Sequence, residues 1–121
     1  MKKILIAEDS HAMRSLLIST IETLDGFEIV EAANGFEALR LLPREKVDLV
    51  ITDINMPDIN GLELIRYIRN NSNYEKIPLF IISTESSEKD LAKGLALGAN
   101  EYLVKPFNPA DLQKLLLKYL G

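Results

Sequence analysis

The sequence contains no cysteine and a single histidine, His11. The lack of cysteine excludes disulfides, thiolate nucleophiles and cysteine-based zinc sites, and it fits a reducing compartment such as the cytosol. One imidazole leaves little room for a histidine-rich metal site. A metal centre in this chain would therefore rely on oxygen ligands, which suit hard cations.

Long hydrophobic runs and an excess of basic charge are also lacking. The apolar run near the N-terminus, residues 4–7, is too short for a signal peptide, and no later run approaches the roughly 18 apolar residues of a membrane span. The 18 Asp and Glu residues outnumber the 14 Lys and Arg residues, for a formal net charge of −4, which disfavours autonomous binding of nucleic acid. We therefore expect a cytoplasmic protein with no membrane insertion and no nucleic acid partner.

What is present is the composition of an ordinary globular domain, with 121 residues of which 47% are hydrophobic and 26% charged. We expect a single domain over residues 1–121. Short apolar runs alternate with longer segments of helical period, a pattern typical of βαβ units. The runs that predict strands are residues 4–7, 27–32, 49–53, 79–82 and 102–104.

Helices are predicted between these strands from apolar residues at three-and-four spacing. Leu16 and Leu95 are among the residues expected on buried helix faces, and Gly94 and Gly98 are expected to share the face of Leu95. The expected start and stop signals are Ser10 as an N-cap, Gly26 as a terminator, Asn34-Gly35 as a turn before a helix over 36–42, Ser87 with Asp90 as a capping box, and Asn108-Pro109 as the last helix start.

Polar residues collect where the predicted strands end. Strands buried on both faces and separated by helices imply an α/β fold with an open, doubly wound parallel sheet, whose ligands bind at the carboxyl ends of the strands. Alone, each polar residue is an ordinary strand-end charge or loop hydroxyl, but five on one rim indicate a site. They are Glu8 and Asp9 after the first strand, Asp53 and Ser83 at the ends of the third and fourth, and Lys105 after the fifth.

The chemistry of this rim follows from its charges. Three carboxylates at close range raise each other's pKa unless a cation intervenes, and Mg²⁺ is the hard cation that takes few carboxylates and keeps several waters. Near neutral pH Asp53 is an ionised nucleophile, and its attack on a phosphoryl group gives an aspartyl-phosphate. The Lys105 ammonium and the Ser83 hydroxyl would then donate to the added phosphoryl oxygens.

Several motifs occur in order along nearly the whole chain: Glu8-Asp9, the run Asp53-Ile54-Asn55-Met56-Pro57 followed by Asn60-Gly61, Ser83-Thr84, Gly98-Ala99 and Lys105-Pro106-Phe107. With these motifs the chain resembles the receiver domains of two-component response regulators, and among them the CheY-like single-domain chemotaxis regulators. The resemblance, not the spacing, implies a flavodoxin-like fold with about five helices and a five-stranded parallel sheet in the order 2-1-3-4-5.

The resemblance also implies a role for each site residue. Asp53 would accept a phosphoryl group from a histidine kinase. Lys105 would bind that group, and the peptide between Lys105 and Pro106 would be cis. The implied Mg²⁺ ligands are Glu8, Asp9, Asp53 and the main-chain carbonyl of Asn55.

In such receivers the switch hydroxyl corresponds to Ser83 and the switch aromatic to Tyr102. Asn55, Thr84 and Glu85 hold positions that tune access to the phosphoryl group and its loss. Because the chain ends at Gly121, directly after the last expected helix, we expect no output domain, and we also expect a monomer. It would signal to a downstream protein through the face of the fourth helix, fifth strand and fifth helix.

Other functions are open to this fold. A phosphatase of the haloacid dehalogenase type would carry a second aspartate where Asn55 stands, and a flavin-binding electron carrier would need a phosphate loop where Glu8 and Asp9 stand. A receiver of a phosphorelay outside chemotaxis and a pseudo-receiver that binds partners without phosphorylation are the remaining alternatives. The complete set of acids, serine and lysine argues against the pseudo-receiver.

Overall fold

Parallel strands form the centre of the protein in a computed structural model that describes residues 1–84 and 88–121. In these ranges the sheet has five strands in the order β2-β1-β3-β4-β5, which confirms the expected order. The strands are β1 Lys2–Ala7, β2 Phe27–Ala32, β3 Leu49–Asp53, β4 Leu79–Thr84 and β5 Glu101–Lys105.

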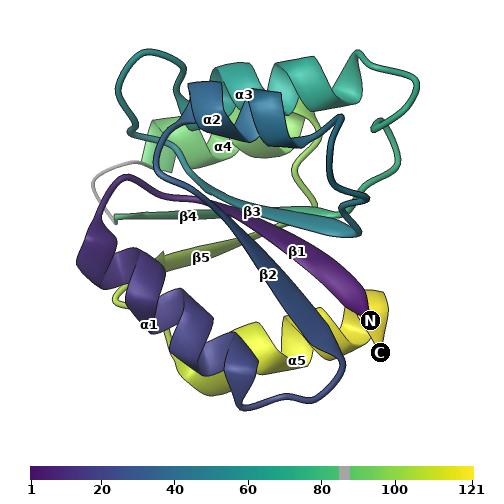
Figure 1. Ribbon diagram of the computed structural model, residues 1–121. Helices are drawn as coiled ribbons and strands as arrows, with labels where there is room; N and C mark the ends of the chain where they lie inside the picture. The colour runs from purple at the N-terminus through teal and green to yellow at the C-terminus, as the bar shows by residue number, and fades with distance from the viewer. Residues whose placement is uncertain (85–87) are drawn as a thin grey trace.

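Helices cover both faces of the sheet (Figure 1). They are α1 His11–Glu22, α2 Gly35–Leu41, α3 Gly61–Arg69, α4 Glu88–Leu97 and α5 Pro109–Leu120. Helices α1 and α5 pack on one face, and α2, α3 and α4 on the other. This layering confirms the doubly wound architecture, and no helix in the described residues is long and apolar enough to cross a membrane.

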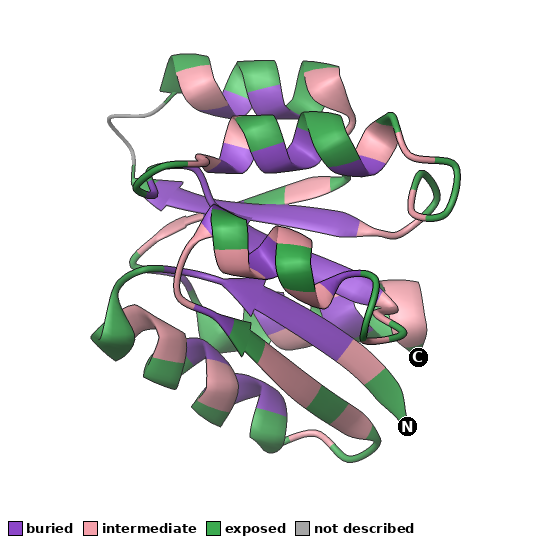
Figure 2. Cartoon of the chain, turned by 45° about the horizontal axis from the view of Figure 1, so that its top comes forward, coloured by how far each residue is buried: buried purple, intermediate pink, exposed green. Residues whose placement is uncertain are grey.

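Alternation along the strands divides the core into two layers. In β1, Ile4 and Ile6 pack toward α1 and α5, whereas Leu5 and Ala7 pack toward the other three helices, because successive side chains of a strand point to opposite faces. The inner strands are accordingly buried along most of their length, and the edge strand β2 is partly exposed (Figure 2). A strand buried on both faces has no polar alternation, and the apolar runs of the sequence reflect this.

Side-chain caps set where most helices begin. Ser10 accepts a hydrogen bond from the Met13 amide, as expected, and Asn108 precedes Pro109 at the start of α5. Asn34 does not form the predicted turn with Gly35: its side chain caps α2, accepting from the Glu37 amide at 2.8 Å. The asparagine is used as an N-cap because its short oxygen satisfies an amide that has no partner within the helix.

Two glycine predictions are wrong. Helix α1 ends at Glu22 with Thr23 as its C-cap, and Gly26 lies in the turn before β2 with a φ of 90°. Gly98 lies beyond α4, with a φ of 125°, instead of on its buried face. A positive φ costs glycine little, so both residues serve in turns. The expected cap Ser87 lies outside the described residues.

Leu16 and Leu95 are exposed to 44% and 38%, contrary to prediction. Each helix rests on the sheet along a narrow stripe, and a residue at its margin faces solvent although it fits the spacing. In α4 the sheet side is taken by Leu91 and Gly94, and a Cβ on Gly94 would meet the Ile81 side chain. The small residue lets α4 lie close to β4.

Candidate functional site

The acidic residues meet at the carboxyl ends of β1 and β3. Glu8 follows β1, and its amide donates to the carbonyl of Ala32 at 3.1 Å, which extends the β1–β2 ladder by one bond. The Glu8 side chain is fully buried, Asp53 is 6% exposed, and Asp9 is exposed. The sheet thus brings together three carboxylates from two strands.

These carboxylates have the chemistry of a site for a hard cation. Glu8, Asp9 and Asp53 each offer one carboxylate oxygen, and the three oxygens lie within 4.8 Å of one another. The second oxygen of Glu8, Oε2, is buried and has no hydrogen-bond partner among the described residues. Buried polar atoms normally have a partner, so the donor set and the unsatisfied oxygen both fit a bound divalent ion such as Mg²⁺.

Lys105, the last residue of β5, crosses to this cluster. Its Nζ lies 2.7 Å from Glu8 Oε1 and 3.1 Å from Asp53 Oδ2. Burial disfavours the ammonium, but the hydrogen bonds and charges of Glu8 and Asp53 outweigh burial and raise the pKa of Lys105. The lysine therefore stays charged and holds the two carboxylates together.

Glu8 is the acid whose ionisation this environment changes most. Burial and the neighbouring Asp53 carboxylate raise the pKa of Glu8 to about 7, although Lys105 acts in the opposite direction. A single ammonium thus compensates only part of the cost of burying two carboxylates. A further cation would complete the charge balance.

The Asp53 carboxylate is oriented from two sides. Its Oδ1 accepts the amide of Ile54 at 2.7 Å, while Oδ2 accepts the Lys105 ammonium. The segment after it is close-packed: the Gly61 amide donates to the Ile54 carbonyl at 2.8 Å, and a Cβ on Gly61 would overlap the Asp53 carbonyl. The start of α3 is therefore packed directly against the end of β3.

The predicted switch residues lie on the neighbouring strands β4 and β5 and differ in exposure. Ser83 is 1% exposed, and its Oγ has no hydrogen-bond partner in the part of the chain that the structure describes. Tyr102 is 48% exposed on β5, in register with Ile81 of β4. Ser83 follows Ile82, which is paired in register with Asp53, so a buried hydroxyl without a partner in the described residues lies one residue beyond Asp53 on the neighbouring strand.

The other predicted site residues flank the cluster. Asn55 and Thr84 are exposed after β3 and at the end of β4, and Thr84 is paired in register with Lys105. Glu85 lies outside the described residues. The peptide between Lys105 and Pro106 is cis, as expected.

Arg14 is a residue of the rim that the sequence did not single out as part of the site. Its Nη1 donates to the main-chain carbonyl of Glu8 at 2.7 Å, and its Nε donates to Glu31 Oε1 at 3.1 Å. The sequence feature that could have pointed to Arg14 is the Ser10 cap, because it places residue 14 in the turn of α1 nearest the strand ends. Spacing alone does not reveal that an arginine in this turn reaches back to residue 8.

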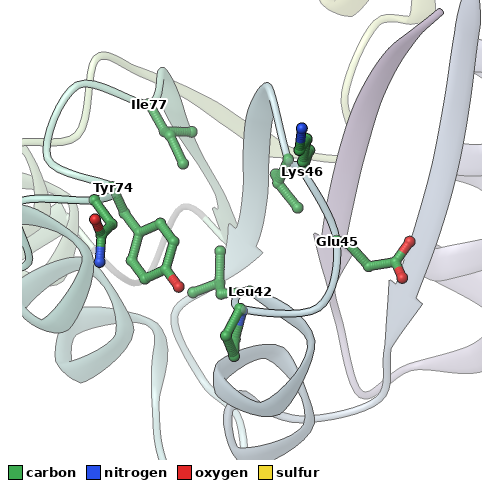
Figure 3. A pocket seen from close by; sticks show the side chains of 8 residues that line it. Leu42, Glu45, Lys46, Tyr74 and Ile77 are labelled. Atoms are coloured by element: carbon green, nitrogen blue, oxygen red, sulfur yellow. The ribbon is translucent and has the colours of Figure 1, made fainter.

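A separate hollow of about 320 Å³ lies at the opposite edge of the sheet, between the segments that lead into β3 and β4. Figure 3 shows Tyr74 and Ile77 on one side of it and Leu42 and Lys46 on the other. None of the predicted site residues lines it, so this hollow is separate from the carboxylate cluster.

Known proteins resemble this chain over almost its whole length. Residues 4–117 match the family model of the response regulator receiver domain. A chemotaxis protein CheY homolog of Campylobacter jejuni is 39% identical over 120 residues, which cover 98% of this chain and 92% of that protein. The range matched by the family model includes Glu8, Asp9, Asp53 and Lys105.

Solved structures share the fold as well. The chemotaxis protein CheY4 of Vibrio cholerae superposes with a TM-score of 0.89 at 38% identity, covering 99% of each chain. The receiver domain of a sensor histidine kinase of Pseudomonas aeruginosa, solved with a magnesium ion coordinated in its active-site cleft, has a TM-score of 0.89 at 28% identity, covering 99% of this chain and 98% of that one. The family match and the shared sheet order show that the chain belongs to the response regulator receiver domain family and is homologous to the CheY chemotaxis regulators.

Proposed function

We propose that the protein is a phosphorylation-dependent signalling switch in which a histidine kinase transfers a phosphoryl group to Asp53 in the presence of Mg²⁺. The observation that carries the proposal is the Lys105 ammonium bound between two nearly buried carboxylates, with the third carboxylate within 4.8 Å. A fold gains no stability from concentrating like charges in this way, so such clusters mark functional sites.

Asp53 acts as the nucleophile in this proposal. One of its oxygens attacks the phosphorus as the bond from phosphorus to the kinase histidine breaks, and the electron pair of that bond goes to the imidazole nitrogen. The product is an acyl phosphate on Asp53. Transfer and later hydrolysis are promoted by this chain's own residues, so the protein is a phosphoacceptor with self-catalysed dephosphorylation and not an enzyme acting on a separate substrate.

Glu8, Asp9, Asp53 and the carbonyl of Asn55 would hold Mg²⁺. When bound, the ion would neutralise carboxylate and phosphoryl charge and orient the phosphoryl oxygens. Lys105 would remain hydrogen-bonded to the added group, because phosphorylation replaces one negative charge by about two. The magnesium-bound receiver from Pseudomonas aeruginosa supports this assignment by analogy.

The switch would start at the Ser83 hydroxyl. It has no other partner in the described residues, so the new phosphoryl oxygens would attract it. Its movement toward Asp53 would vacate space that Tyr102, on the neighbouring strand, could enter, and the face formed by α4, β5 and α5 would change. Asn55, Thr84 and Glu85 would set the lifetime of the phosphoryl group.

The name of the Campylobacter jejuni relative favours a role in chemotaxis over another phosphorelay. In this role residues 1–121 act as one monomeric receiver domain in the cytoplasm. The output partner is a protein that binds the α4-β5-α5 face when Asp53 is phosphorylated.

Acetyl phosphate with Mg²⁺, followed by intact mass measurement, tests the proposal without requiring the kinase. The native protein should gain one phosphoryl group, and Asp53→Asn should gain none. Asp58→Asn is the matched control, since Asp58 is an exposed acid of the following loop at a φ of 65°, which asparagine tolerates well. It should be phosphorylated like the native protein. If the native protein gains no mass, phosphorylation of Asp53 is refuted. The alternative that then stands is a pseudo-receiver that binds partners without phosphorylation.

A further inference from the structure

We infer that Arg14 is a positioning residue that fixes the peptide between Glu8 and Asp9 and so sets the geometry in which both carboxylates bind Mg²⁺. The inference rests on the proposed function, because it concerns the same ion. Arg14 itself contacts the Glu8 carbonyl, the Glu31 carboxylate and the His11 ring and is not proposed as a ligand.

The hydrogen bonds around Glu8 show how its backbone is held. The ladder between β1 and β2 ends with the Glu8 amide on the Ala32 carbonyl. The Glu8 carbonyl lies beyond the ladder, and in the described ranges Arg14 is the donor that reaches it, at 2.7 Å. Strand pairing therefore holds the amide side of Glu8, and a side chain holds its carbonyl side.

The peptide that carries this carbonyl links the two acids. The two torsions that flank it, ψ of Glu8 and φ of Asp9, set the direction of one side chain relative to the other. The Glu8 side chain is fully buried and Asp9 is exposed. The Glu8 carboxylate therefore approaches the proposed Mg²⁺ site from the protein interior, and the Asp9 carboxylate approaches it from the solvent side. Holding the peptide keeps both oxygens within 4.8 Å of Asp53.

Arg14 is itself well held. Its side chain is 15% exposed, and Nε contacts Glu31 at 3.1 Å. Glu31 is 53% exposed, and a salt bridge at such an exposed site contributes little. The charge-assisted hydrogen bond to the Glu8 carbonyl is therefore the stronger of these two contacts of Arg14. Glu31 orients the guanidinium.

Charge and geometry predict opposite effects when Arg14 is removed. Losing a cation that is bonded to the main chain of Glu8 would by itself strengthen Mg²⁺ binding at the acidic cluster. Losing the bond that orients the ligands would weaken it, and groups that orient metal ligands typically contribute 10- to 100-fold in affinity. The sign of the change thus separates positioning from simple electrostatics.

The experiment is titration of the metal-free protein with Mg²⁺ by isothermal calorimetry. Arg14→Met should bind about tenfold more weakly than the native protein, at the low end of the effect of such groups. Arg14→Lys keeps the charge, but one ammonium cannot serve both acceptors, so its affinity should fall between the two. Arg44→Met is the control: it removes the same charge from an exposed residue at the opposite edge of the sheet and should bind like the native protein.

A second readout does not depend on the metal. In metal-free samples the Asp9 amide should shift and exchange faster with solvent in Arg14→Met than in Arg44→Met. If Arg14→Met does not fold, Arg14→Lys carries the same comparison.

The outcomes distinguish the two hypotheses. A native protein that does not bind Mg²⁺ would overturn the proposed function. Native binding with equal or tighter binding in the Arg14 variants would overturn only the positioning role of Arg14.

Discussion

At the scale of single residues, Glu8 is a carboxyl that the proposed site requires but whose burial in ionised form destabilises the fold. Its carboxyl is fully buried, next to Asp53, and Lys105 is its one cationic partner in the described residues. The resulting pKa of about 7 means that the folded protein binds a proton there more tightly than the unfolded chain does. The stability of the metal-free protein must therefore depend on pH through this residue.

The direction of that dependence follows from linkage. A carboxyl whose pKa is raised by folding contributes stability that is fully present below about 4.5, its ordinary value, and is lost as the pH rises through about 7. The free energy of unfolding of the native protein, measured relative to that of Glu8→Gln, should therefore decrease as the pH rises from about 4.5 to about 7. The total decrease should be on the order of 3 kcal/mol. Urea unfolding of both metal-free proteins across this range measures it. A difference that is constant with pH would show that Glu8 titrates normally.

At the scale of elements, the site depends on how closely α3 approaches β3. A Cβ on Gly61 would overlap the Asp53 carbonyl and the Ile54 backbone. The Gly61 amide already bonds to the Ile54 carbonyl, so the first residue of the helix is attached to the segment that follows the proposed phosphoacceptor. A change at the start of this helix should reach the site directly.

Gly61→Ala should lower the free energy of unfolding by about 1–3 kcal/mol, the usual cost of forcing a methyl group into a packed region. It should also slow phosphorylation by acetyl phosphate, because the backbone at Asp53 must shift. The control is Gly26→Ala, which strains a φ of 90° in an open turn with nothing within 4 Å. It should destabilise the protein while the folded fraction is phosphorylated at the native rate. Equal rates in both variants would contradict the coupling between α3 and the site.

At the scale of the whole molecule, the cluster concentrates negative charge in a protein whose formal net charge is already −4. The three acids and Lys105 together carry a formal charge of −2 when all are ionised. Each negative charge removed from the cluster should stabilise the metal-free fold, whereas Mg²⁺ should stabilise the native cluster.

Asp53→Asn should accordingly be more stable than the native protein without Mg²⁺, because it removes one of the crowded negative charges. Adding Mg²⁺ at ten times its Kd should raise the native free energy of unfolding by about 1.4 kcal/mol, since the ion binds the folded state. The same Mg²⁺ concentration should stabilise Asp53→Asn less, because one ligand charge is lost. Denaturant unfolding with and without the ion tests both points, and an Asp53→Asn protein less stable than the native one would contradict this account.

The sequence predicted the helices and strands correctly where interactions within a few residues determine them. Strands such as β3 are apolar runs because both faces are buried, and Ser10 and Asn108 cap helices through contacts a few residues away. The prediction was wrong at Leu16 and Leu95, where burial depends on how each helix is rotated against the sheet. It was also wrong at Gly98, whose role depends on where α4 ends.

By itself, the sequence determined that five polar residues would lie on one rim, because the carboxyl ends of parallel strands meet at one edge of a sheet. Only the tertiary structure decided that Lys105 lies between Glu8 and Asp53, and that Arg14 reaches the Glu8 carbonyl. The physical reason is the separation in sequence between the interacting residues. Periodicity and caps reflect interactions within a few residues, whereas these contacts depend on strand register and helix placement across the sheet.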